Sequence, residues 1–510
     1  MPTRAPFLTA ILCLACLGPA AAAGDRTHAG HDLGRVDFAT SCAPAVRDDF
    51  NRGLALLHHM TYPQARAAFA DVAKRDPGCA MAHWGVAMTY FQPLWPTRPD
   101  LAERESAWRE VERAQALKPP TERERMYVAM VAAFFEDPAS DDYWLRIRRW
   151  ADATARLHAA FPDDPDAIAL QALALLATTP ADRVTRANAD AAAKLLLALN
   201  ARYPEHPGAM HYMVHANDVP GREHESLEIT RHYEAVAPDN AHALHMPTHV
   251  YTRLGDWEGV VRGNLRAAEA ALKVPAGDKG QYVWDEFPHA IEYLVYGYLQ
   301  QGDLTRATAQ RDRLLATHAL QPSFKTAFHL ASAQARIPLA RRDWANAAAL
   351  APRTPASGIA WDKFPWPDAT LWFAHGLGSA HLHRTADAQA AHDQHVALEA
   401  KATAAQEMLF ARNIAMLRLE LEAAIAQAGG RNDEALARLR EAAALEAATP
   451  KHPVTPGPLL PADELLGDLL MDLGRPAEAQ AAYRSALAHW PGVRHSIEGE
   501  RRATAALAAR

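Results

Sequence analysis

Histidine is concentrated in one part of this chain. Of the 25 histidines among 510 residues, eight fall between positions 206 and 249, where the chain average would give about two. Imidazole nitrogens bind transition metals and exchange protons near neutral pH. The eight are His206, His211, His215, His224, His232, His242, His245 and His249. Metal binding is therefore the first chemistry to consider.

The spacing of five of these histidines matches that of a helical metal site. His211 and His215 are four residues apart, and His242, His245 and His249 follow one another at intervals of three and four. Side chains at these intervals share one face of a helix, where two imidazoles can hold one divalent ion. We therefore predict that these five histidines are metal ligands. The other two late histidines of the cluster, His224 and His232, should lie on an intervening helix and face outward.

Three further residues are second-rank candidates for the same site. Asp218 follows His211 by seven residues, His289 lies in the segment WDEFPHAIEYLVYGYL, and His58 precedes His59 near the start of the chain. Five histidines exceed the three that usually hold a catalytic zinc ion. The sequence leaves two arrangements open: two metal ions, or one ion with an outer set of supporting imidazoles.

The identity of the metal is not fixed by the sequence, because imidazole suits Cu, Zn and Fe alike. Methionine sulfur favours copper, although methionine more often packs in a core. Nearby carboxylates favour iron or zinc. The methionines concerned are Met210, Met213 and Met246, and the carboxylates are Asp218, Asp285 and Glu292, with Glu286 and Tyr293 beside them.

Two observations weigh against a metal site. Histidines on helices can simply face solvent or pack against neighbouring helices. Pro247 also lies between His245 and His249 and removes a helical hydrogen bond. The resulting kink either aims the three imidazoles inward or breaks their common register.

The elements that must position these side chains are helices. Apolar residues recur at helical intervals between Gly, Pro and Asp, and strand patterns are nearly absent. Residues 466–491 show the internal order of a repeat unit. Leu466, Leu470 and Tyr483 stand where an interface between two helices is filled, small residues stand where the helices touch, and Pro491 ends the unit.

This unit resembles a tetratricopeptide repeat. Copies begin near Gly53, Tyr251 and Gly378, and weaker ones surround residues 153–165, 335–347 and 430–442. The resemblance implies an all-α solenoid of about eight or nine helix pairs, stacked as a right-handed superhelix with a concave groove. It also implies that first helices line the groove, which would bring the histidine pairs of consecutive repeats together.

The chain also resembles a group of exported bacterial tetratricopeptide-repeat proteins with HxxxH-type motifs and poorly defined activity. The segments that carry this resemblance are FNRGLALLHHMTYPQA, DPGCAMAHWGVAM, HYMVHANDVP, HALHMPTHVYTRLGDW and KHPVTPGPLLPADELLGDLL. The resemblance implies the fold, export and the histidine motifs, but no known reaction.

Five regions follow from the composition. Residues 1–23 read as a signal peptide with cleavage after Ala23, because an 11-residue apolar stretch precedes three alanines. An uncleaved anchor and a lipoprotein using Cys16 are the alternatives. Residues 24–41 form an extended lead-in, 42–350 a first repeat array, 351–370 a Pro- and Trp-rich insertion, and 371–510 a second array. Five prolines in Pro450–Pro461 prohibit a continuous helix there.

Removal of the signal peptide leaves two cysteines, Cys42 and Cys79. In an exported protein two thiols most simply form one disulfide, and the alternative is a pair of buried thiols. No segment of the mature chain has about 18 uninterrupted apolar residues, so we expect no transmembrane span. The predicted location is periplasmic or secreted.

The predicted function is binding of a transition metal through a histidine cluster in the groove, with metal-dependent catalysis left open. The alternatives are a periplasmic interaction scaffold without metal, which would hold a peptide or protein in the groove, and a metal store or chaperone. The net charge of −7 and the absence of a basic domain argue against nucleic acid as a partner. The oligomeric state is not predicted.

Overall fold

The computed structural model describes residue 1 and residues 33–95, 98–180, 183–277 and 279–509. Residues 32–510 form one compact unit. Apart from Met1, the predicted signal peptide 1–23 lies outside the described residues, and so does the start of the lead-in. The described part of the lead-in, 33–41, has no regular secondary structure.

Helices fill most of the described chain. They are α1 (Arg47–His58), α2 (Tyr62–Arg75), α3 (Ala80–Met88), α4 (Leu101–Ala116), α5 (Glu122–Phe135), α6 (Tyr143–Ala160), α7 (Pro165–Ala177), α8 (Ala187–Arg202), α9 (Pro207–Asn217), α10 (Leu227–Val236), α11 (Ala241–His245), α12 (Pro247–Leu254), α13 (Trp257–Leu272), α14 (Glu286–Gln301), α15 (Leu304–Ala316), α16 (Phe324–Ala340), α17 (Trp344–Ala348), α18 (Pro365–His381), α19 (Thr385–Ala404), α20 (Met408–Ala428), α21 (Asn432–Ala447), α22 (Ala462–Asp472), α23 (Pro476–His489) and α24 (Arg494–Ala508). Two 3-10 helices (Pro44–Val46 and Trp361–Lys363) and a two-stranded antiparallel ribbon, β1 (Pro275–Ala276) with β2 (Tyr282–Val283), complete the described elements.

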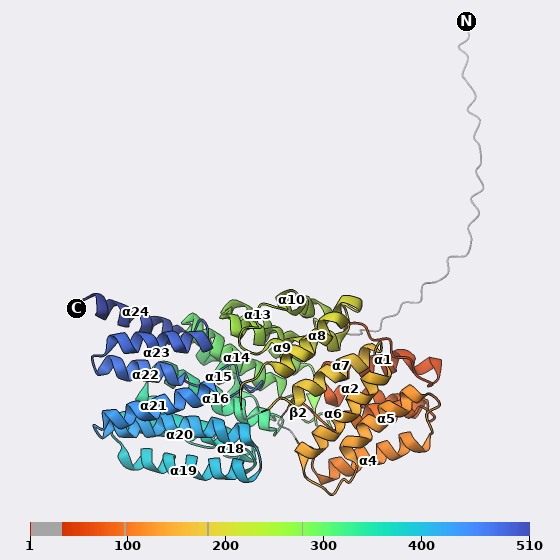
Figure 1. Ribbon diagram of the computed structural model, residues 1–510, viewed down its shortest axis with the longest axis horizontal. Helices are drawn as coiled ribbons and strands as arrows, with labels where there is room; N and C mark the ends of the chain where they lie inside the picture. The colour runs from red at the N-terminus through yellow and green to blue at the C-terminus, as the bar shows by residue number, and fades with distance from the viewer. Residues whose placement is uncertain (2–32, 96–97, 181–182, 278, 510) are drawn as a thin grey trace. The chain divides into compact units, whose positions relative to one another are not determined.

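Consecutive helices pack as antiparallel pairs, and each pair packs on the next (Figure 1). The predicted all-α tetratricopeptide-repeat solenoid is confirmed. Counting α11 and α12 together as one first helix, the described residues contain eleven pairs and a closing helix, α24. The expected number was about eight or nine. Pairs were missed because helix lengths vary, as in the five-residue α17, so that several copies depart from a regular period.

Glycines allow aromatic side chains to fill the contact between paired helices. A Cβ atom at Gly467 would lie 2.7 Å from the Tyr483 ring, and one at Gly499 would lie 2.4 Å from it. Near the start of the array, Cβ atoms at Gly53 and Gly85 would lie 3.0 and 2.5 Å from the Phe69 ring. Two repeats thus use one packing device, in which an aromatic ring is held between two glycines.

The Pro- and Trp-rich segment is shorter than predicted. The expected insertion was 351–370, but α18 begins at Pro365. Proline is favoured in the first turn of a helix, where its missing N–H has no intrahelical partner, so the prolines near this boundary start the helix instead of preventing it.

The segment Pro450–Pro461 is not helical, as its prolines predict. It crosses the first helices of the array. Arg336 of α16 donates to the carbonyl oxygens of Pro458, at 2.7 Å, and Gly457, at 2.8 Å. The chain's own backbone therefore lies along the face that the repeat pattern offers to a partner.

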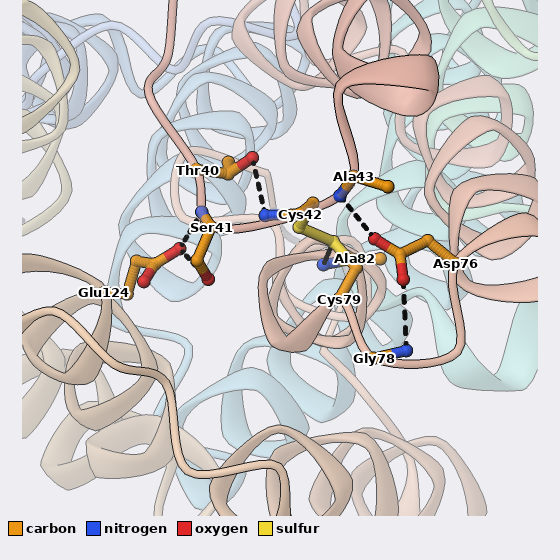
Figure 2. Close-up of a disulfide and its surroundings, with 9 residues drawn as sticks. All are labelled: Thr40, Ser41, Cys42, Ala43, Asp76, Gly78, Cys79, Ala82 and Glu124. Carbon is orange, nitrogen blue, oxygen red and sulfur yellow. Dashed lines mark hydrogen bonds between the residues drawn. A yellow bond between two sulfur atoms is a disulfide. The ribbon is translucent and has the colours of Figure 1, made fainter.

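Cys42 and Cys79 form a disulfide, with their Cα atoms 4.7 Å apart (Figure 2). The bond joins the first residue after the lead-in to the start of α3, where the Cys79 sulfur also accepts a hydrogen bond from Ala82 N–H. Asp76 accepts from Ala43 N–H at 2.7 Å beside it. No helix in the described part of the chain is both long and apolar enough to cross a bilayer.

Candidate metal centre

Three neighbouring first helices carry the predicted ligands. His211 and His215 lie on α9, and His289 lies on α14. Between these helices, α11 and α12 contact both, α12 against α9 and α11 against α14. The capping residues set where α9 and α11 begin. The His206 ring accepts from Ala209 N–H at 3.2 Å, and Asn240 Oδ1 accepts from Ala243 N–H at 2.9 Å.

Pro247 interrupts a hydrogen bond without breaking the helical course of the chain. Met246, between α11 and α12, keeps right-handed helical angles of φ −53° and ψ −43°. His242, His245 and His249 therefore stay on one face, where the ring centroids of His242 and His245 lie 6.3 Å apart and those of His245 and His249 lie 4.9 Å apart. Of the two outcomes open for this proline, the structure has the one in which the imidazoles converge.

The converging side chains form two groups of three. The first triad is His211, His215 and His242, and the second triad is His245, His249 and His289. Within each triad, one nitrogen from each ring lies within 4.8 Å of the others, a spacing that three ligands of one metal ion can adopt. The chain from 242 to 249 contributes to both triads.

The Nδ1 atoms of four rings face oxygen atoms, and three of them make hydrogen bonds. In those three the oxygen can only accept, so Nδ1 carries the proton. His211 Nδ1 donates to the His58 carbonyl at 2.6 Å, and His249 Nδ1 donates to Asp218 at 2.9 Å. His242 Nδ1 lies 3.2 Å from Glu286 Oε2 in an ion-pair contact without hydrogen-bond geometry.

The fourth ring is oriented by an asparagine of α13. His245 Nδ1 lies 2.7 Å from Asn264 Oδ1, while the Asn264 amide nitrogen donates to the Val260 carbonyl at 2.8 Å. That second bond fixes which end of the amide faces the histidine. His245 Nδ1 is therefore the donor.

In the second triad both Nδ1 atoms are donors, so the Nε2 atoms of His245 and His249 carry lone pairs that face one another. In the first triad the same holds for His211 Nε2. His211 Nε2 and His242 Nε2 lie 3.2 Å apart in the first triad, and His245 Nε2 and His249 Nε2 lie 3.0 Å apart in the second. Two acceptors at this distance repel each other unless a cation lies between or beside them. The third ring of each triad, His215 or His289, has a buried Nε2 without a hydrogen-bond partner.

Burial keeps the rings neutral, which is the form that binds metals. Desolvation, reinforced by neighbouring imidazoles, lowers the pKa of His211, His215, His245 and His289 well below the usual value. The pKa of His249 is also lowered by desolvation, although Asp218 opposes the shift.

The nearby carboxylates support the rings and face cations of the chain. Asp218 contacts Lys451 at 2.7 Å and Arg253 at 2.9 Å, and these cations hold its pKa below the usual range against the effect of burial. Glu286 is paired with Lys325, and Glu292 with Arg336. Asp285 accepts from Ser323 at 2.7 Å. These carboxylates are thus engaged around the triads and are not part of them.

Of the three second-rank candidates, Asp218 and His289 lie at the second triad, and His58 does not. His289 completes the second triad, and Asp218 orients His249. His58 lies elsewhere, in a group with Asp166 and His206. There the two Nε2 atoms share Asp166 Oδ1 at 2.9 and 3.2 Å, and both Nδ1 atoms are also hydrogen-bonded. All four ring nitrogens of these two histidines therefore have partners, whereas Asp166 Oδ2 is buried without one. His58 contacts the first triad through its carbonyl oxygen.

Two supporting residues were missed by sequence reasoning. His329 of α16 lies 2.7 Å from His289 Nδ1, and Trp95 packs edge-on against His242 with ring centroids 5.4 Å apart. Both lie in first helices or loops far along the chain from the cluster, and only the repeat register could have indicated His329. Met210, Met213 and Met246 pack in hydrophobic clusters. His224 and His232 are exposed, as expected.

No protein-family model matches the chain, and no curated protein is significantly similar to it. Solved structures with similarity include an APC/C Cut9–Hcn1 hetero-tetramer, at 11% identity and TM-score 0.41, covering 92% of this chain and 79% of that one. Human IFIT1 bound to m7Gppp-AAAA has 13% sequence identity and a TM-score of 0.37, and the match covers 84% of this chain and 90% of that one. The P58(IPK) TPR domain has 11% sequence identity and a TM-score of 0.20, and the match covers 91% of this chain and 99% of that one. At these values the comparisons add nothing about function.

Proposed function

We propose that this chain is an exported metalloprotein that binds two transition-metal ions, one in each histidine triad. The observation that carries the proposal is the pair of close Nε2–Nε2 contacts between four rings, three of which have an Nδ1 atom that donates to an oxygen. A metal ion beside each pair turns the repulsion between lone pairs into coordination. The oriented Nδ1 atoms are the outer support that metal-binding histidines usually have.

The donor set favours copper or zinc over iron. Each triad offers three imidazoles, and the nearest carboxylates are bound to cations of the chain or to Nδ1 atoms. Iron sites commonly include a carboxylate ligand, whereas three imidazoles suit zinc and copper. Three protein ligands leave a coordination position open on each ion, as in catalytic sites and unlike closed structural sites. We therefore favour catalysis over metal storage.

Metal content of single and double variants tests the proposal. Purified protein reconstituted with Zn or Cu should hold two ions per chain. His215→Ala and His249→Ala should each hold one, and the double variant none. His224→Ala/His232→Ala, which changes two exposed imidazoles, should still hold two.

Several outcomes would contradict this assignment. One ion in the wild type would reduce the six histidines to a single site with outer supports. If the protein holds no ion after reconstitution with Zn, Cu or Fe, the better assignment is an interaction scaffold that binds a peptide or protein. Loss of metal from the His224→Ala/His232→Ala variant would show that exposed histidines bind the metal non-specifically.

A further inference from the structure

A cavity of about 210 Å³ borders the first triad. His215 forms part of its wall, and none of the other five triad histidines does. The exposed fractions agree with this placement, since His215 is 8% exposed and the other five are at most 1% exposed. The first triad therefore borders the cavity through the His215 side chain, and the second triad does not border it.

Aromatic and aliphatic side chains make most of the cavity wall. Trp95, Tyr143, Trp144 and Phe410 contribute rings, and Leu176 contributes an aliphatic surface from α7. An engineered apolar cavity of about 150 Å³ is large enough to hold benzene. A single aromatic ring with a small substituent is thus the size class that fits.

The charged groups of the wall are paired with each other. Arg98 makes two hydrogen bonds to Glu407, at 2.9 and 3.0 Å, and Lys451 contacts Asp218 at 2.7 Å. Burial lowers the pKa of the remaining basic group, His452, to about 3, so that ring is neutral at neutral pH. A charged ligand would find no unpaired counter-ion in this wall, and burying it would be costly.

We infer that the cavity binds a neutral, single-ring aromatic molecule whose hydroxyl group or similar donor reaches the ion of the first triad. This inference rests on the proposed function, since the donor needs a metal to bind. The ring lies among the aromatic walls, and the donor enters on the His215 side. The second ion takes no external ligand from this cavity.

Cobalt-reconstituted protein provides the test, because Co(II) in an imidazole site has visible absorption that responds to ligands. Phenol should change this spectrum, and benzoate and cyclohexanol should bind at least tenfold more weakly. Leu176→Trp should weaken phenol binding at least tenfold with two ions still bound. The matched control is Leu175→Trp, one residue earlier on α7 and outside the cavity wall, which should bind phenol normally.

Further variants separate the two triads. The His249→Ala protein, with only the first ion, should keep the phenol response, and His215→Ala should lose it. Leu176→Ala enlarges the cavity and should improve binding of 2-naphthol at least threefold, which checks the cavity without relying on a bulky residue.

The outcomes distinguish the inference from the proposal beneath it. Two bound ions with no response to phenol, or a response unchanged by Leu176→Trp, would overturn the inference and leave the metal sites standing. A response that persists in His215→Ala would place the ligand at the second triad. Failure to bind cobalt at all would overturn both.

Discussion

At the scale of single residues, the protonation of each imidazole is determined by its neighbours. His245 is the clearest case, because Asn264 can present only its oxygen once its nitrogen is bound to Val260. The sequence predicted which histidines come together, from intervals of three and four. It could not predict how they divide between two triads, because the division depends on which rings reach across to a neighbouring helix.

Removal of the Asn264 acceptor should weaken the second metal site selectively. In Asn264→Ala, His245 loses the partner that fixes its ring orientation and tautomer, and loss of such partners typically costs 10–100-fold in metal affinity. Competition with a chelator of known affinity would measure the change, with the first site unchanged.

Asn413→Ala is a matched control for this variant. Asn413 Nδ2 donates to the carbonyl four residues earlier, as Asn264 does, but the residue lies on α20 away from the triads. Equal loss of affinity in both variants would mean that the effect comes from helix packing and not from the hydrogen bond to His245.

At the scale of elements, the sequence predicted that the segments are helices, but it did not predict the residues at which the helices begin and end. Small residues around Tyr483 revealed the paired-helix pattern because Gly467 and Gly499 leave room for its ring. The start of α18 was predicted too late, because prolines were interpreted as insertion and not as a first turn. The contacts of loops such as Pro450–Pro461 could not be predicted, because they depend on side chains distant in sequence.

The junction between α21 and α22 should make stability depend on pH. Glu446, near the end of α21, accepts from Trp490 Nε1 at 2.8 Å and from Ala462 N–H at 3.2 Å. Burial raises the pKa of this carboxyl to about 7. The protonated form is favoured in the folded state, so this group stabilises the fold below the unfolded pKa of about 4.3 and loses that effect as pH rises through 7.

Glu446→Gln should remove this dependence. As pH rises from 5 to 8, the wild type should lose roughly 3 kcal/mol of unfolding free energy relative to the variant. Urea denaturation at several pH values measures it, and Glu441→Gln, exposed on the same helix, serves as the control. A constant difference across this range would show that Glu446 titrates normally.

At the scale of the whole described unit, contacts between distant repeats lie beside the histidine triads. Arg98 and Glu407 are 309 residues apart in sequence, and Lys451 contacts Asp218 across several repeats as well. Repeat arrays ordinarily make contacts between neighbouring units only. The fold class was therefore predictable from local patterns, whereas this closure was not.

Metal removal should lower the stability of the unit as a whole, because the triads join three first helices. Each ion bound to the folded state adds about 2.7 kcal/mol at a free concentration 100 times its dissociation constant. Chelation of wild-type protein should lower the denaturation midpoint accordingly, and the His215→Ala/His249→Ala protein should not respond. An unchanged midpoint in the wild type would indicate that metal does not bind the folded state preferentially.

The segment that crosses the array has a consequence for how the molecule assembles during synthesis. All six triad histidines have been synthesised once residue 289 is added, but Lys451, which holds Asp218, comes more than 150 residues later. The early repeats can stack as they emerge, since each needs only its neighbour. Closure around the triads needs the last third of the chain, so we expect the docking of distant segments to be slower than the stacking of neighbouring repeats. Until then we expect the histidines to be more open to solvent than in the folded unit, and we expect that period to be the one in which an ion would enter most freely.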